Sequence, residues 1–145
     1  MMTAFPPWLG WALLSATFAA LTAIFAKLGL QHIDADLALL LRTVVICLVL
    51  AATVAATGKW RNPLSLPAAT TTWLVLSALA TGASWWCYFH ALQLGPASQV
   101  APVDKLSVVL VAVFAAVLLG EQLGPRQWSG VALISAGVVL MSWRS

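Results

Sequence analysis

The sequence predicts an all-α membrane protein with five transmembrane helices. Of its 145 residues, 62% are hydrophobic and only 8% are charged, whereas about 25% of the residues in a typical soluble domain are charged. A soluble domain of this size could not bury so many apolar side chains, because small domains leave much of their surface in water. Lipid must be the solvent for much of the surface. Polar and Gly/Pro breaks divide the chain into segments of about 20 residues, the length that crosses a bilayer.

The first two predicted helices run approximately from Trp8 to Leu30 and from Leu37 to Thr57. The residues before Trp8 include no basic region, and the apolar stretch that follows is long and has no small-residue cleavage site. A signal peptide has both features, so we expect the first segment to be retained as a helix. The polar run from Gln31 to Asp36 separates the two helices.

Three further helices are predicted over residues 71–94, 98–119 and 128–143. The breaks before them combine a helix stop with polar residues, at 58–67, at Gly95-Pro96 and at 120–126. The whole chain, residues 1–145, is therefore expected to form one transmembrane domain. Because the connections are short, successive helices should be antiparallel neighbours, and an odd number of spans places the two termini on opposite sides of the membrane.

The positive-inside rule favours a cytoplasmic N-terminus, because Lys59, Arg61 and Arg126 then lie inside. The bias is small, since Lys27 and Arg42 are near the outer face in this orientation. A chain with so weak a bias could insert in both orientations.

Four charged residues, Lys27, Arg42, Asp104 and Lys105, lie inside or at the edge of the predicted spans. An ion in hydrocarbon costs several kcal/mol, so it reaches the interface, is paired, or has a function. These four residues and His90 all fall in the same half of the predicted membrane, as a single polar pocket would require.

Each of these charges also has a structural interpretation. Lys27 and Lys105 can extend to the headgroups, which leaves Arg42 and Asp104 as the residues most expected to face a cavity or to pair with each other. If a helix begins at Pro102, Asp104 lies in its first turn and favours the helix dipole. Lys105 is then about 100° round the helix from Asp104, so no good pair between them is expected.

Aromatic residues around His90 form a second candidate for the cavity wall. Trp85 and Tyr88 lie three positions apart and share a helix face. Their alternative roles are lipid anchoring or packing. On the last helix, Gly130 and Gly137 provide a smooth strip for helix contact. Pro102 and Glu121 are assigned gating or structural roles.

Other classes of function are disfavoured. The chain contains no H-E-x-x-H, G-x-S-x-G or phosphate-loop motif, so no enzyme activity and no cofactor is predicted. Cys47 and Cys87 lie in different segments without metal-ligand spacing, so no metal site is expected. A net charge of +3, spread among apolar runs, argues against binding of nucleic acid.

The second half of the chain carries a family resemblance, in the runs Tyr88–Ser98, Ala101–Val103, Leu118–Glu121 and Trp128–Gly137. Together with Lys27 and Arg42, these runs resemble the EamA domain of the drug/metabolite transporter superfamily. The run Pro102–Ser107 is similar to that of the single-repeat, five-helix bacterial and archaeal transporters in this superfamily.

The resemblance implies a secondary transporter of a small organic metabolite, located in the bacterial or archaeal cytoplasmic (inner) membrane. A chain with one repeat would work with a second copy as a homodimer, parallel or antiparallel, by alternating access. The last helix, which carries Gly130 and Gly137, would form the dimer contact. Substrate identity and the direction of transport stay open, as does proton coupling through Asp104, including whether this residue is protonated at rest. The alternative is a non-transporting membrane subunit that assembles with or regulates a larger complex.

Overall fold

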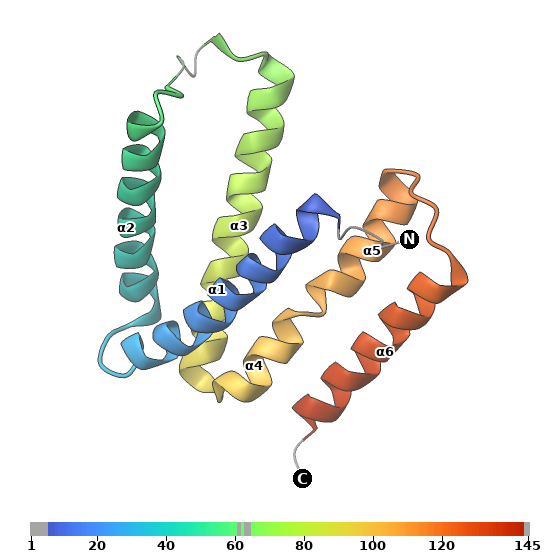
Figure 1. Cartoon of the computed structure of the whole chain (residues 1–145). Coiled ribbons are helices and arrows are strands. Elements are labelled where there is room, and N and C mark those ends of the chain that lie inside the picture. Colours follow the sequence, from blue (N-terminus) through green and yellow to red (C-terminus); the bar gives the residue numbers. More distant parts are fainter. Residues whose placement is uncertain (1–5, 61, 63–64, 144–145) are drawn as a thin grey trace. The chain divides into compact units, whose positions relative to one another are not determined.

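In a computed structural model, the described residues, 6–60, 62 and 65–143, form six helical segments and no strand (Figure 1). Four are continuous: α1 (Pro7–Gly29), α2 (Ala35–Ala56), α3 (Ala68–Leu94) and α6 (Pro125–Ser142). The fourth predicted helix is present in two pieces, α4 (Ala97–Asp104) and α5 (Ser107–Leu118). The prediction of an all-helical chain is thus confirmed for the described residues.

Three of the five predicted spans are long and apolar enough to cross a membrane, among the residues that the structure describes: Trp8–Gly29, Ala35–Ala56 and Ala97–Leu118. The helices α3 and α6 are formed as predicted, but they carry more polar residues and do not meet this criterion. Their position in the bilayer, and that of the two termini, stays a prediction.

The helix ends have local causes. At the end of α2, Gly58 has a φ of 63°, which a glycine adopts without steric cost. The Lys59 amide donates to the Val54 carbonyl at 3.2 Å, and the Gly58 amide donates to the Ala55 carbonyl at 3.1 Å. This is the Schellman pattern of helix termination. The helix α6 begins three residues before the predicted start because Pro125 occupies its first turn, after the cap residue Gly124.

The chain consists of two compact units, each described here by itself. One comprises residues Phe25–Gln93, with the end of α1 and the antiparallel helices α2 and α3 (Figure 1). Its buried apolar side chains are Leu30, Ala35, Phe89 and Leu92. They belong to the end of α1, the start of α2 and the end of α3, so the core lies where these helix ends are joined.

The other unit comprises Met1–Ile24 and Leu94–Ser145. Within it, α6 packs along both α4 and α5. Between α4 and α5, the Lys105 amide donates to the Pro102 carbonyl and the Leu106 amide to the Val103 carbonyl, both at 3.0 Å. These i→i−3 bonds form a tight turn that interrupts the helix. Asp104 is therefore the last residue of α4, and the prediction that it could lie in a first turn is wrong, because the helix begins at Ala97 and Pro102 lies inside it.

Candidate functional site

Polar side chains of the unit Phe25–Gln93 connect the end of α1 with the end of α3. The ammonium group of Lys27 is partly buried and donates a hydrogen bond to the Leu92 carbonyl at 2.5 Å. Leu92 is in the last turn of α3, where carbonyl groups lack partners within the helix. A cation favours this negative end of the helix dipole. Lys27 therefore fixes one helix end against another.

Arg42 stacks on aromatic side chains of α3. Its Cζ atom lies 3.5 Å from the centroid of the Trp85 ring and 5.6 Å from that of Phe89. Trp85 in turn makes an edge-to-face contact with Tyr88, with centroids 5.8 Å apart and an interplanar angle of 84°. We name these four residues the arginine–aromatic cluster.

The guanidinium group of Arg42 is only half-buried. Within the described part of the chain, no ion pair joins Arg42 to a carboxylate. A guanidinium group has five N–H donors, and stacking on a ring leaves those at its edges able to bind a ligand. The cluster therefore combines a cationic fork with an aromatic wall.

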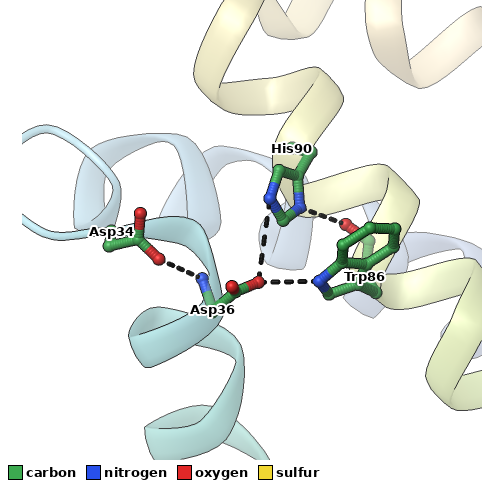
Figure 2. Close-up of polar contacts among 4 residues, drawn as sticks. All are labelled: Asp34, Asp36, Trp86 and His90. Atoms are coloured by element: carbon green, nitrogen blue, oxygen red, sulfur yellow. Dashed lines mark hydrogen bonds and ion pairs between the residues drawn. The ribbon is translucent and has the colours of Figure 1, made fainter.

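A third set of contacts, shown in Figure 2, joins the first turn of α2 to the last turns of α3. Asp34 caps α2, and its Oδ1 accepts a hydrogen bond from the Asp36 amide at 2.8 Å. The Trp86 indole N–H donates to Asp36 Oδ1 at 2.7 Å. His90 Nε2 lies 3.7 Å from the same oxygen, and His90 Nδ1 lies 2.9 Å from the Trp86 carbonyl oxygen.

In the other unit, two charged residues that are adjacent in the sequence form an ion pair. Lys105 Nζ donates to Asp104 Oδ2 at 3.0 Å. The prediction that these two residues do not pair is wrong. It assumed a continuous helix, whereas Lys105 lies in the turn after α4, where its long side chain can bend back to its neighbour.

The remaining predicted residues of this unit lie on helix ends and faces. The Glu121 side chain is exposed, and its amide donates to the Ala115 carbonyl at 3.1 Å after a turn at Gly120, whose φ is 69°. At Gly130 and Gly137, no atom of the described residues would lie within 4 Å of an added Cβ. The face that carries these two glycines is therefore open within the chain.

The structure thus brings together five of the predicted site residues in one unit, namely Lys27, Arg42, Trp85, Tyr88 and His90. Asp104 and Lys105 belong to the other unit, so the pairing of Arg42 with Asp104 stays a prediction. No group of three or more His, Cys, Asp or Glu side chains that could hold a metal ion occurs among the described residues.

Asp36 and Trp86 are contact residues that the sequence analysis missed. Asp36 belongs to the polar break before the second predicted helix, and Trp86 is one of the aromatic residues around His90, but neither is among the predicted site residues. One signal was present, because Trp86 and His90 are four positions apart and share a helix face. An antiparallel pair of helices also places the start of one beside the end of the other.

The model of the EamA-like transporter family matches residues 6–143. A Sinorhizobium protein described as an uncharacterized transporter in the cobO 3′ region is 58% identical over 135 residues, which are 93% of this chain and 96% of that protein.

A more distant relative is described as the probable 4-amino-4-deoxy-L-arabinose-phosphoundecaprenol flippase subunit ArnE of Yersinia pestis (strain Pestoides F). It is 35% identical over 71 residues, which are 49% of this chain and 62% of that protein. No solved structure matches. The family match confirms the resemblance found in the sequence and the assignment to transporters rather than enzymes. The chain belongs to the EamA-like transporter family, whose model matches it almost from end to end.

Proposed function

We propose that this chain is one half of a secondary transporter, which carries a small organic metabolite across the bacterial cytoplasmic membrane as a homodimer by alternating access. The family match over residues 6–143 and the similarity to a protein described as a transporter support this proposal. Transporters are commonly built from two structural repeats with the substrate site between them. A second copy of this chain would supply the second repeat.

The observation that carries the proposal is the arginine–aromatic cluster. Arg42 has no carboxylate partner among the described residues, yet it is half-buried and stacked on Trp85. A planar guanidinium group matches the geometry of a carboxylate or a phosphate. The aromatic rings offer an apolar surface beside it. The substrate that fits this cluster has an anionic group and a flat or apolar organic body.

We assign supporting roles to the other polar residues. Lys27 and His90 position the end of α3, on which Trp85 and Tyr88 lie. The turn between α4 and α5, which follows Pro102, is a place at which a span can bend during alternating access, and Glu121 lies at the far end of the same broken helix. Asp104 would couple transport to a proton or a cation if, during the transport cycle, its carboxylate released Lys105 and bound the proton or cation instead. Gly130 and Gly137 are the proposed contact with the second copy.

A second candidate function is that of a subunit in a larger membrane complex. One observation favours it: the relative from Yersinia pestis is described as a flippase subunit. The two candidate functions predict different sets of protein chains in the complex. Purification of the tagged full chain from its own membranes, followed by crosslinking, should yield a dimer of this chain if it is a homodimeric transporter. A stoichiometric second protein would instead indicate a subunit.

The transport function is tested with the purified full chain in proteoliposomes. We would measure uptake of radiolabelled benzoate, as an aromatic carboxylate, and of glucose 1-phosphate, as a phosphate ester. At least one of these anions should enter faster than it enters protein-free liposomes, and Arg42→Ala should abolish the difference. Arg126→Ala, which changes an exposed arginine at the start of α6, is the matched control and should leave uptake unchanged. Equal uptake by the wild type and Arg42→Ala would contradict the role of the cluster.

A further inference from the structure

The contacts among Asp36, Trp86 and His90 determine where the histidine carries its protons. A carbonyl oxygen only accepts hydrogen bonds, so His90 Nδ1, 2.9 Å from the Trp86 carbonyl oxygen, must be the donor in that contact. A neutral imidazole has one N–H group. In the neutral ring, Nε2 therefore presents a lone pair toward Asp36 Oδ1, which is 3.7 Å away (Figure 2).

Two lone pairs that face each other repel, so the neutral form of His90 gains nothing from Asp36. A second proton on Nε2 changes this contact into an attraction between an imidazolium and a carboxylate. The position of the Asp36 carboxylate is restrained, because the Trp86 indole donates a hydrogen bond to the same oxygen at 2.7 Å. The ring of His90 also packs on that of Trp86, with centroids 4.6 Å apart, so its orientation is restrained.

The other described charged or titratable groups of the unit contact other partners or lie at other positions; Lys59, for example, follows the opposite end of α2. On α1, Lys27 donates to the Leu92 carbonyl. Before and within α2, Asp34 accepts from the Asp36 amide and Arg42 stacks on Trp85. On α3 itself, His90 is accompanied by the exposed thiol of Cys87. His32, the other histidine of the chain, is exposed in the turn between α1 and α2. Asp36 is thus the carboxylate that faces the His90 ring.

We propose that His90 Nε2 is a proton-binding site, with Asp36 as its counter-ion, and that the bound proton holds the first turn of α2 against the last turns of α3. Loss of the proton to water removes this attraction and leaves the hydrogen bond from the Trp86 indole to Asp36 between the two helix ends, so that they separate more readily. Because Arg42 and Trp85 lie on the same two helices, the proton also favours the stacked form of the arginine–aromatic cluster. Only this last effect rests on the proposed transport function; the proton-dependent contact does not.

The contact can be measured without any substrate. We would place spin labels at Leu40→Cys on α2 and Gln93→Cys on α3, both exposed positions, in the full chain with Cys47→Ser and Cys87→Ser. The interspin distance distribution would be recorded in lipid nanodiscs at about pH 5 and about pH 8.5, on either side of the range in which histidines titrate. We expect a shorter, narrower distribution at the acidic pH. His90→Gln and Asp36→Asn should each remove this difference.

His32→Gln is the matched control, since it removes the other histidine and should retain the full pH response. Asp36→Asn keeps an oxygen that can accept from the Trp86 indole, so it removes the charge while preserving that contact. A wild-type distribution that is the same at both pH values would overturn the proposal, and so would a pH response that persists in His90→Gln. The first of these tests needs only the labelled chain, so it does not depend on whether His90→Gln or Asp36→Asn folds.

Discussion

The two units of this chain use their charged residues in different ways. In Phe25–Gln93, the polar contacts join residues far apart in sequence, such as Lys27 with Leu92 and Asp36 with Trp86. In the other unit, the ion pair found among the described residues joins two adjacent residues, Asp104 and Lys105, beside a break in a helix. Long-range contacts hold three helix ends in register, whereas the local pair joins no helix to another. Under the proposed function, we infer that the first unit provides the binding site and that the second bends at the turn between α4 and α5.

The largest effect that distinguishes the two units should be on stability. Lys27→Met removes the hydrogen bond to the Leu92 carbonyl and leaves that carbonyl without this donor, at a cost of about 2 kcal/mol. Lys105→Met removes an exposed pair, which costs less than about 1 kcal/mol. Thermal unfolding of the detergent-solubilised full chain should therefore show a clearly lower midpoint for Lys27→Met than for Lys105→Met. Equal midpoints would show that the Lys27 contact contributes no more than a surface pair.

The next effect should be on substrate recognition at Arg42. Arg42→Lys keeps the positive charge but loses the planar fork and most of the stacking on Trp85. We expect uptake of the transported anion at low concentration to fall about tenfold, which corresponds to about 1.4 kcal/mol. The reciprocal change, Lys105→Arg, should leave uptake nearly unchanged, because its exposed pair with Asp104 needs only a charge. A wild-type rate in Arg42→Lys would show that only the charge of Arg42 matters.

The sequence was a good guide to what depends on neighbouring residues. Apolar segments bounded by Gly, Pro and polar runs predicted all the helices, and the ends differ from the predictions by a few residues. The helix α3 begins at Ala68, directly after Pro67, which is three residues before the predicted start at Thr71. Family motifs were also recoverable, because they are contiguous in the sequence.

Long-range partners were harder to predict. Trp86 and Asp36 are fifty positions apart, and no periodicity within one helix indicates which side chains meet across two. The error at Lys105 had the same origin, since it assumed the geometry of a regular helix. The turn at this point forms because the Lys105 and Leu106 amides donate to the carbonyl groups three residues earlier. The sequence alone does not predict this hydrogen-bond pattern.

The smallest effect should come from the joint itself. Pro102 lies inside α4 and cannot donate an amide hydrogen bond to the carbonyl four residues earlier, that of Ser98. Pro102→Ala restores this donor and stiffens the helix that leads into the turn at Lys105. If the turn bends during alternating access, stiffening it slows the conformational step. We expect the maximal rate of uptake to fall about fivefold, which corresponds to about 1 kcal/mol in the barrier.

The control for this variant is Pro125→Ala. Pro125 occupies the first turn of α6, where the amide of the residue has no partner within the helix, so the substitution adds no such restraint. The substrate concentration at half-maximal uptake should stay constant in both variants, because neither changes the arginine–aromatic cluster. A fall in affinity without a fall in the maximal rate of Pro102→Ala would mean that the region around α4 and α5 contacts the substrate. The contrast between a binding unit and a flexible unit would then be wrong.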